Sequence, residues 1–486
     1  MNFALIKAVR KIAVFIAALL ATFLTSVVDA SDSSATVGKI SKPNLIVILT
    51  DDQGYHDVGF NGCTDIPTPN IDSIAQNGIR FTSGYVSYPV CSPSRAGLLT
   101  GRYEQRFGHE RNPRFEPDNR LSGLPLSERT LADELGKVGY QSGIIGKWHL
   151  GAHPDLHPLK RGFNEFFGML GGGHRYFAEE LTITETSKAK TEEDSYRLQI
   201  LRNDKPVKTT QYLTDEFSDE AVRFVTRHKQ SPFFLHLAYN APHAPLQASE
   251  KYLSRFLKID DPKRRTYAAM VSAVDDGVGR LLSKLRELGI EENTLVIFLS
   301  DNGGPIDANA SNNSPLRSAK GSPWEGGWRV PFAMQWPGHL PRGAAYDQPV
   351  ISLDIFATIA ALANAPADAA RPLDGVNLMP YLTGAKTGAP HDNIYLRMHD
   401  RGAFAVRGGE FKLVVSKQGS DAELFNLGTD ISETKNIAQS HSQKLQELER
   451  LRADWNAQLI EPAFEGLETK KQNSKSGKPD AEAVHE

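Results

Sequence analysis

The residues best suited to chemistry lie in the run CSPSRAGLLTGR at positions 91–102. Pro93 fits the first turn of a helix, where no backbone N–H is needed, so the run predicts a helix that begins near Cys91. Cys91 then stands at the helix N-terminus, where free N–H groups and the helix dipole favour an anion. Arg95 and Arg102 add positive charge close by. This arrangement favours anionic chemistry at the sulfur, although an isolated Cys is more often a buried structural residue.

Two pairs of oxygen-bearing side chains follow two continuous apolar runs. Asp51 and Asp52 come after residues 45–50, and Asp301 and Asn302 come after residues 295–300. Apolar runs of this kind suit strands that are buried on both faces of a parallel sheet. Adjacent carboxylates need a cation between them, and hard oxygen ligands suit Ca²⁺ or Mg²⁺. The pattern predicts a metal site, with a solvated turn as the alternative for the first pair.

Basic side chains follow two further predicted strands. Lys147 and His149 come after residues 141–146, and they point to the same side if the backbone is extended. His243 comes after the strand at 233–239, between two prolines that restrict the backbone. A single Lys or His is ordinarily a surface or structural residue. Because the carboxyl ends of parallel strands meet at one edge of a sheet, we expect all four strand ends to form one site.

The elements that must position these residues predict an α/β fold with a large, mostly parallel central sheet flanked by helices. Apolar residues at helical spacing predict the helices, which are expected near 69–77, 131–138, 270–288 and 354–362. The less regular stretch at 171–215 is either an insertion over the mouth of the site or a mobile surface loop.

The C-terminal part of the chain has a different pattern. Short apolar stretches separated by turns predict a small antiparallel sheet, and they lie at 403–407, 411–415 and 423–426. Apolar residues from Leu445 to Leu459 predict one helix packed on this sheet. We therefore expect a catalytic domain over 31–392, a sheet-and-helix subdomain over 393–462 and a disordered tail over 463–486.

Composition excludes one class of protein. The chain has 486 residues, of which 40% are hydrophobic and 23% charged, as is usual for globular proteins. Its formal net charge is −3 and its pI is about 6.6, which argues against a nucleic-acid binder that works through bulk positive charge. The two cysteines, Cys63 and Cys91, would form a disulfide in an ordinary exported protein. Chemistry at Cys91 instead leaves Cys63 as a lone thiol.

Residues 1–30 have the pattern of a secretory signal. A positively charged start precedes an apolar run over 12–28, and small residues offer a cleavage point before Ser31. A membrane anchor is the alternative, but the run is short for a span and contains Thr25 and Ser26. No Cys lies near the cleavage point, which excludes lipid attachment there. We expect an exported protein, periplasmic or secreted, without stable membrane insertion after cleavage.

The run at 91–102 resembles the signature of the type I sulfatases, Cys-x-Pro-x-Arg with a Thr-Gly-Arg ending. Three further stretches resemble motifs of this family: GKWHLG at 146–151, APHAP at 241–245 and a Lys-Gly loop at 320–327. The resemblance implies the alkaline-phosphatase-like fold. In this family a maturation enzyme oxidises the cysteine to formylglycine, whose hydrated aldehyde is the nucleophile. It therefore implies that Cys91 is modified and that a formylglycine-generating enzyme is a partner.

The resemblance also implies a role for each residue of the site. One Ca²⁺ is held by Asp51, Asp52, Asp301, Asn302 and the modified Cys91. Arg95, Lys147 and Lys320 neutralise the charge of the sulfate oxygens. His149 takes a proton from the second hydroxyl of the sulfated hydrate, which expels sulfate. His243 and Lys320 serve the protonation of the leaving alcohol, and either of them is the general acid.

The implied activity is the hydrolysis of sulfate esters. The expected substrate is a sulfated carbohydrate, with carrageenan-type galactans favoured and glycosaminoglycans or aryl sulfates as alternatives. Four basic residues are expected to bind further sulfates or sugar hydroxyls, and they are His109, Arg111, His174 and Arg175. Two other functions stay open: a phosphate or phosphonate monoester hydrolase of the same superfamily, and a non-catalytic carbohydrate-binding relative.

Overall fold

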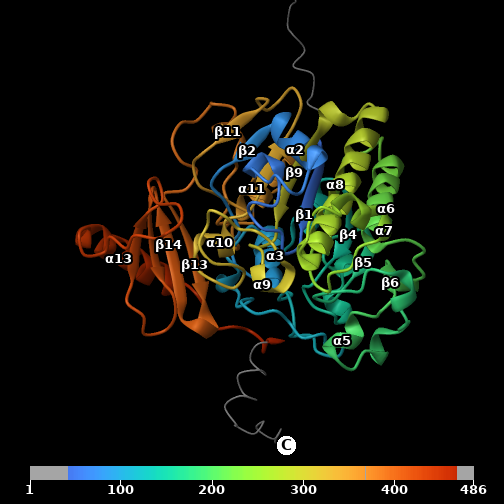
Figure 1. Ribbon diagram of the computed structural model, residues 1–486, viewed down its shortest axis with the longest axis horizontal. Helices are drawn as coiled ribbons and strands as arrows, with labels where there is room; N and C mark the ends of the chain where they lie inside the picture. The colour runs from blue at the N-terminus through green and yellow to red at the C-terminus, as the bar shows by residue number, and fades with distance from the viewer. Residues whose placement is uncertain (1–41, 367, 468–486) are drawn as a thin grey trace, which may run out of the picture. The chain divides into compact units, whose positions relative to one another are not determined.

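The computed structural model describes residues 42–366 and 368–467, so the predicted signal at 1–30 lies outside the described residues. A ten-stranded sheet forms the centre of the described chain (Figure 1), in the order β11-β2-β10-β9-β1-β8-β4-β5-β6-β7. Its strands are β1 (Asn44–Thr50), β2 (Ile79–Phe81), β4 (Gln141–Lys147), β5 (Glu165–Met169), β6 (Ile200–Arg202), β7 (Lys205–Val207), β8 (Phe233–Ala238), β9 (Thr294–Ser300), β10 (Phe332–Gln335) and β11 (Ala344–Tyr346).

The four strands that were expected to carry the site are neighbours. β9, β1, β8 and β4 lie side by side in this order, and each is parallel to the next. In the register of β1 and β9, Thr50 lies opposite Ser300, so Asp51 and Asp301 leave the sheet at the same level. The prediction that these strand ends meet at one edge is confirmed.

The sheet is mixed at its margins. β10 is antiparallel to both β9 and β2, and β6 is antiparallel to β5 and β7. β6 and β7 belong to the stretch 171–215, so part of this stretch extends the sheet. The sequence did not predict the short strands β2, β10 and β11, because three or four residues carry too little periodicity to be distinguished from loops.

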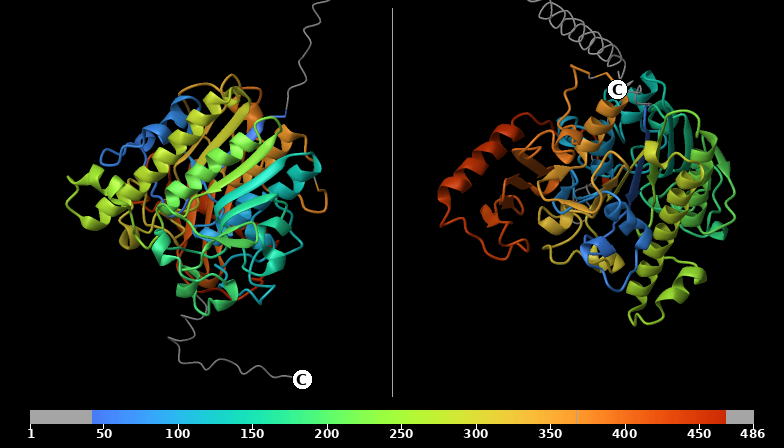
Figure 2. Two further views of the ribbon diagram at one scale, coloured as in Figure 1. Left: turned by 90° about the vertical axis from the view of Figure 1, so that its right-hand side faces the viewer. Right: turned by 90° about the horizontal axis from the view of Figure 1, so that it is seen from above.

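Helices cover both faces of the sheet (Figure 2). Ile46 and Ile48 of β1 face the core shared with α2, α6 and α8, whereas Leu45 and Val47 face the core shared with α3, α4 and α11. An apolar run without alternation is therefore explained by burial on both faces. The helices before the C-terminal sheet are α2 (Pro69–Gln76), α3 (Cys91–Thr100), α4 (Leu131–Lys137), α5 (Glu192–Ser195), α6 (Leu213–Arg227), α7 (Glu250–Leu253), α8 (Pro262–Glu287), α9 (Ile306–Asn309), α10 (Glu325–Trp328), α11 (Leu353–Ala363) and α12 (Met379–Leu382).

A separate antiparallel sheet follows in the C-terminal part, as predicted. It consists of β13 (Asn393–Met398), β14 (Ala403–Gly408), β15 (Phe411–Val415) and β16 (Glu423–Asn426). Val406 and Leu413 pack with Leu448 of α13 (Ser442–Asn456) on one face, and Ala405 and Phe425 join the main core on the other. A two-stranded sheet of β3 (Gly84–Tyr85) and β12 (Val350–Ile351) completes the strands of the described residues.

The described chain stays in contact with the core beyond residue 462, where the tail was expected to begin. The amide of Ala463 donates to Gly108 O at 2.8 Å, and the amide of Leu467 donates to Asn112 O at 3.1 Å. Phe464 is buried against the ring of His109. Ordered structure therefore extends to residue 467, and the rest of the predicted tail lies outside the described residues.

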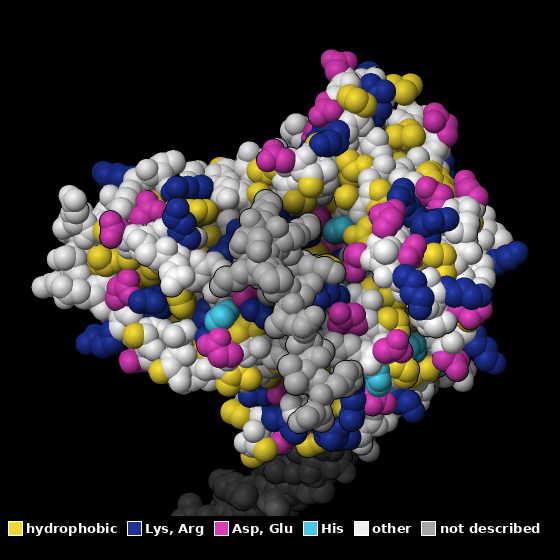
Figure 3. Space-filling view, turned by 90° about the horizontal axis from the view of Figure 1, so that it is seen from below, with side chains coloured by type: hydrophobic (Ala, Val, Ile, Leu, Met, Phe, Trp, Pro, Cys, Tyr) yellow, Lys and Arg dark blue, Asp and Glu magenta, His cyan; other side chains and the backbone are white. Residues whose placement is uncertain are grey.

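Charged side chains of both signs lie on the surface of the described residues. On the face seen from below, basic and acidic side chains are interspersed (Figure 3). Within 42–366 and 368–467, no helix has the length and apolar character that crossing a bilayer requires.

Candidate active site

Cys91 is the first residue of α3, and the helix that follows it is buried along its whole length. Val90 before it is extended, and Pro93 lies in the first turn, as the sequence predicts. Cys91 is only 2% exposed, and this burial raises the pKa of its thiol to about 12, although Lys147 and Lys320 act in the opposite direction. The unmodified thiol is therefore protonated at neutral pH and is a poor nucleophile.

Three carboxylates surround the sulfur of Cys91. Asp51 Oδ1 lies 3.4 Å from Cys91 Sγ, and Asp52 Oδ1 lies 4.0 Å from it. Asp52 has a φ of 67°, a left-handed conformation that Asp tolerates better than most residues. Its amide donates to Asp301 Oδ1 at 3.2 Å, which ties the ends of β1 and β9 together. Ligand atoms of these carboxylates and of Cys91 all lie within 4.8 Å of one another.

This group of side chains fits a hard cation. Asn302 Nδ2 donates to Asp52 Oδ1 at 2.7 Å, while Asn302 Oδ1 is buried and accepts no hydrogen bond from any described residue. A buried amide oxygen without a partner is unfavourable, and a metal ion would satisfy it. Burial and the charge of Asp51 raise the pKa of Asp301 to about 6, as expected where carboxylates crowd together. The donors are all oxygens apart from residue 91, which suits Ca²⁺ or Mg²⁺.

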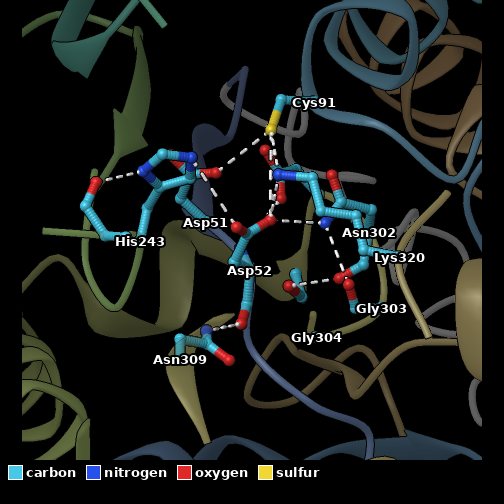
Figure 4. Close-up of polar contacts among 12 residues, drawn as sticks. Asp51, Asp52, Cys91, His243, Asn302, Gly303, Gly304, Asn309 and Lys320 are labelled. Atoms are coloured by element: carbon cyan, nitrogen blue, oxygen red, sulfur yellow. Dashed lines mark hydrogen bonds and ion pairs between the residues drawn. The ribbon is translucent and has the colours of Figure 1, made fainter. Parts of the chain in front are cut away.

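Three cationic side chains line the same site. Arg95 Nε and Nη2 donate to Asp301 Oδ2 at 3.0 and 2.8 Å. Lys147 Nζ donates to Asp51 Oδ2 at 2.6 Å. Lys320 Nζ lies 2.6 Å from Asp52 Oδ1 and 3.0 Å from Cys91 Sγ (Figure 4). Burial alone would raise the pKa of Asp52, but Lys320 and His243 hold it at about 2. The site therefore combines metal-binding anions with cations that suit an anionic ligand.

Two neutral histidines complete the site. His243 Nδ1 donates to Ala244 O at 2.6 Å, which leaves Nε2 as an acceptor 3.7 Å from Asp52 Oδ2. Burial lowers the pKa of His243 to about 4. Burial also lowers the pKa of His149 well below its usual value, and neither ring nitrogen of His149 has a hydrogen-bond partner among the described residues. Both rings are therefore available to accept a proton.

The backbone conformation at His149 differs from the extended one expected from the sequence. Its φ is 57°, so the backbone has left the extended conformation after Lys147. The expectation that Lys147 and His149 share one side of an extended strand therefore does not apply, because β4 ends at Lys147. His149 nevertheless lies beside the start of α3, because Ser92 Oγ, next to Cys91 in the chain, donates to His149 O at 2.6 Å.

The mouth of the site lies at His243 and Lys320. Their side chains are 17% and 18% exposed, whereas the side chains of Asp51 and Lys147 are 0% exposed. We therefore expect a ligand to approach from the side of His243 and Lys320, with Lys147 and Asp51 at the buried end of the site.

The C-terminal sheet holds the loop that carries Lys320. Lys412 Nζ of β15 lies 2.8 Å from Glu325 Oε1 and 2.7 Å from Glu433 Oε1, and the first two side chains are completely buried. Glu433 Oε2 accepts from the amide of Glu325 at 2.8 Å. Arg317, at the start of the loop, donates to Glu433 O at 2.9 Å. No pattern in the sequence predicts the contacts of Glu325 and Arg317 with the C-terminal part of the chain, because these contacts join residues 87 to 116 positions apart.

The four residues expected to bind substrate have partners inside the protein. His109 is completely buried, and its Nε2 lies 2.7 Å from Ser92 Oγ. His174 is also buried, with Nδ1 2.9 Å from Arg175 O. The two arginines form ion pairs, Arg111 with Asp400 at 2.6 Å and Arg175 with Glu193 at 2.5 Å. The burial of the histidines favours a structural role, and the substrate contacts of all four stay predictions.

The stretch 171–215 packs against the site. Tyr176 Oη donates to His243 O at 2.8 Å, so this stretch is not a detached loop. Gly172 packs against the ring of His149 and Gly173 against the ring of Tyr196, so Tyr196 lies near the site. Burial raises the pKa of Tyr196, and the charge of Glu192 adds to this shift. Tyr196 and Glu192 were not among the predicted site residues, because the stretch has neither a motif nor a clear periodicity.

Cys63 does not pair with Cys91, and both are free. The Sγ of Cys63 donates to Asp65 Oδ1 at 3.2 Å, and burial raises the pKa of its thiol to about 12. The interpretation of Cys63 as a lone thiol agrees with this position.

Comparisons with known proteins match this geometry. The family model described as Sulfatase matches residues 43–365, and the one described as N-sulphoglucosamine sulphohydrolase, C-terminal, matches residues 320–458. N-acetylgalactosamine-6-sulfatase of Mus musculus is 36% identical over 419 residues, which are 82% of this chain and 77% of the mouse protein. Arylsulfatase A of Bos taurus is 34% identical over 404 residues, 80% of this chain and 77% of the bovine protein.

A solved structure gives the same result. The crystal structure of Ps i-CgsB in complex with k-i-k-neocarrahexaose is 40% identical, with a TM-score of 0.83, and covers 90% of this chain and 97% of that chain. The chain therefore belongs to the sulfatase family of alkaline-phosphatase-like fold and is a sulfuric ester hydrolase.

Proposed function

We propose that this protein removes sulfate from a carrageenan-type oligosaccharide or polysaccharide. The observation that carries the sulfatase chemistry is the position of Cys91, at the start of α3 and between the carboxylates of Asp51 and Asp52 and the ammonium of Lys320. The carbohydrate is supported by the likeness to Ps i-CgsB, whose solved complex holds a carrageenan hexasaccharide, k-i-k-neocarrahexaose.

We infer that Cys91 is converted to formylglycine by a maturation enzyme and that Asp51, Asp52, Asp301 and Asn302 hold one Ca²⁺ beside it. The hydrated aldehyde at position 91 would supply one hydroxyl for attack on sulfur and a second for the release of sulfate, and an ion held by these four residues would lower the pKa of such hydroxyls. A thiol has no second hydroxyl, so an adduct formed on Cys91 itself would have no internal route to release.

The side chains of the site then neutralise the charge of the sulfate and transfer the protons. Arg95 and Lys147 lie at the buried end and neutralise the charge on sulfate oxygens. Lys320 Nζ lies between the nucleophile position and the mouth, where the alcohol departs. His149, with two free ring nitrogens, accepts the proton at the release step. Either His243 or Lys320, which both line the mouth, protonates the leaving alcohol. Lys320 carries a proton for this step, whereas His243 must first take one up, because burial lowers its pKa to about 4.

The experiment that tests this chemistry compares matured and unmatured protein. Protein produced with a formylglycine-generating enzyme is expected to carry an aldehyde at position 91, by mass spectrometry of the peptide, and to hydrolyse 4-nitrophenyl sulfate. Protein produced without that enzyme, and the Cys91→Ala variant, should fold but be nearly inactive. Full turnover from protein with unmodified Cys91 would end this mechanism. Assaying the phosphate and sulfate esters of the same phenol separates a sulfatase from a phosphate monoester hydrolase.

The substrate is tested with defined sulfated oligosaccharides. A second candidate is a glycosaminoglycan that carries N-acetylgalactosamine-6-sulfate, which the 36% identity to the mouse enzyme supports. We expect the matured protein to release sulfate from carrageenan oligosaccharides with a higher kcat/KM than from chondroitin oligosaccharides. The reverse order would replace the first candidate by the second.

We also propose that the protein is exported, periplasmic or secreted, with residues 1–30 as the signal. N-terminal sequencing of the mature protein is expected to begin at Ser31, and a mature protein that retains residues 1–30 would contradict this.

A further inference from the structure

A pocket lies beside the nucleophile position, where the catalytic core meets the turn between β13 and β14. Six of its lining residues are Tyr88, Val90, Arg111, Asn112, Asp400 and Arg401. Val90 directly precedes Cys91, so the pocket adjoins the start of α3. The turn (His399–Arg401) contributes the opposite side. The pocket therefore joins a part of the C-terminal sheet to the site.

The charged side chains that line this pocket leave one positive charge without a neutralising partner. Arg111 donates twice to Asp400, from Nε at 2.8 Å and from Nη2 at 2.6 Å, so this pair is neutral. Glu110 is neutralised by Arg397. Arg401 has no carboxylate within 4.0 Å anywhere in residues 42–366 and 368–467, and its side chain is exposed. One positive charge is therefore left over, and it faces solvent beside the mouth.

The position of Arg401 is fixed relative to the catalytic loop. Its Nη1 donates to the carbonyl of Gly321, the residue after Lys320. Gly321 has a φ of 76°, and a Cβ there would lie 3.6 Å from Arg401 Nη2, so backbone and guanidinium are in close contact. One nitrogen is used in this bond, and the remaining N–H donors of the planar fork have no partner among the residues that the structure describes, so they can bind a ligand.

We propose that Arg401 forms an anionic subsite that binds a second sulfate ester, on a sugar next to the one whose sulfate is removed. The proposal rests on the proposed carbohydrate sulfatase function. A guanidinium fork donates two parallel hydrogen bonds to the oxygens of an anion, which a lysine does not. The Arg111–Asp400 pair holds the turn that presents Arg401 and needs no contact of its own with the ligand.

The test uses three matured proteins: the wild type, Arg401→Gln and Lys417→Gln. Lys417 is an exposed lysine in the turn between β15 and β16 and lies outside the pocket lining, so its variant is the matched control for the loss of one charge. Each protein is assayed on 4-nitrophenyl sulfate and on two carrageenan oligosaccharides that differ only in the second sulfate. A third oligosaccharide carries a carboxylate in place of that sulfate.

Arg401→Gln is expected to raise KM for the doubly sulfated oligosaccharide about 10-fold or more, the effect of losing a charge-assisted hydrogen bond. Its kcat on 4-nitrophenyl sulfate and its KM for the singly sulfated oligosaccharide should stay within about twofold of wild type. Arg401→Lys should recover part of the loss, because the charge stays and the fork is gone. Lys417→Gln should behave as wild type on every substrate.

Three results would overturn the subsite. An equal loss of kcat on every substrate means that Arg401 only holds the Lys320 loop through Gly321. Unchanged kinetics of Arg401→Gln mean that Arg401 binds nothing. A preference of the wild type for the carboxylate over the second sulfate, lost in Arg401→Gln, assigns a different anion. If the wild type hydrolyses 4-nitrophenyl sulfate but neither sulfated oligosaccharide, the proposed carbohydrate substrate is wrong. The subsite, which depends on that substrate, is then wrong as well.

Discussion

Position 91 shows how strongly burial controls the chemistry of one residue. A thiol at the start of a helix, near Arg95 and two lysines, has the surroundings in which thiolates usually form. The carboxylates of Asp51 and Asp301 and the nearly complete burial act against this, and the pKa of the thiol rises to about 12. The same surroundings suit a neutral hydroxyl that loses its proton beside a cation. The site therefore fits a modified residue better than the encoded one.

The carboxylates around residue 91 imply that activity depends on a bound cation. Chelation with EDTA or EGTA is expected to abolish sulfatase turnover, and Ca²⁺ is expected to restore it, because the protein donors are oxygens. Ca²⁺ should also raise the thermal denaturation midpoint, because the ion binds only the folded arrangement of Asp51, Asp52 and Asp301. Both are measured on one chelated preparation. Full turnover of metal-free protein would contradict the prediction.

Glu104 is a buried carboxyl outside the site, in the turn after α3. Burial, with a smaller contribution from the charge of Glu110, raises its pKa from 4.5 to about 8. The folded protein keeps a proton that the unfolded chain loses, so this stabilisation is complete below pH 4.5 and disappears as the pH rises through about 8.

The Glu104→Gln variant removes this ionisation. It is expected to match wild type in denaturation midpoint at about pH 5 and to exceed it at about pH 9, where the wild type must ionise a buried acid at a cost on the order of 4 kcal/mol. Glu250→Gln, at an exposed position, is the control. Equal midpoints of wild type and Glu104→Gln at pH 9 would refute the assignment.

At the scale of elements, the loop from Arg317 to Glu325 depends on a strand of another sheet. Lys412 lies between Glu325 and Glu433, and burial raises the pKa of Glu433 to about 7 even with this lysine beside it. Buried ion pairs contribute little net stability, but removing one partner is costly. We therefore infer that the network positions the loop that carries Lys320 and contributes little to the free energy of unfolding.

Lys412→Met is expected to destabilise the protein by about 3 to 5 kcal/mol, because it leaves buried carboxylates without a cation. The double variant Lys412→Met/Glu433→Gln should regain part of this stability, yet keep a reduced kcat on 4-nitrophenyl sulfate, because the loop has lost its ionic contacts. Denaturation and steady-state kinetics measure the two effects. A double variant with wild-type kcat would show that the network does not position Lys320.

Elements differ in how well the sequence predicts them. β1 and β9 were predictable because seven-residue apolar strands, each followed by oxygen ligands, repeat the same pattern. β13 and the short strands β2, β10 and β11 were not predicted, because pairing with distant strands decides their structure. For the same reason Arg401 and Tyr196, which no motif marks, could be placed near the site only by the fold.

At the scale of the whole molecule, the C-terminal sheet is part of the main core. Leu396 and Phe425 are buried in it, and Trp455 of α13 stacks on Tyr395 at a ring distance of 5.0 Å and meets Tyr103 edge-on at 5.2 Å. The boundary expected at residue 392 therefore marks a change of architecture within one core.

Deletion of residues 393–486 is accordingly expected to give insoluble or inactive protein, since it uncovers apolar surface and frees the Lys320 loop. Soluble yield and turnover of 4-nitrophenyl sulfate, compared with the full chain, are the measurements. A soluble truncated protein with wild-type kcat would contradict this interpretation.

The buried network of Lys412, Glu325 and Glu433 also limits which parts of the chain can be exchanged with those of a related protein. The two family models overlap over 320–365, so the segment around Glu325 is shared between them. A recombination event that imports a foreign C-terminal sheet without its own loop leaves an unmatched charge in the interior, which selection removes. We therefore expect chimaeras of two sulfatases to fold best when the segment from Arg317 to Glu433 comes from a single parent, which the soluble yield of such chimaeras would measure.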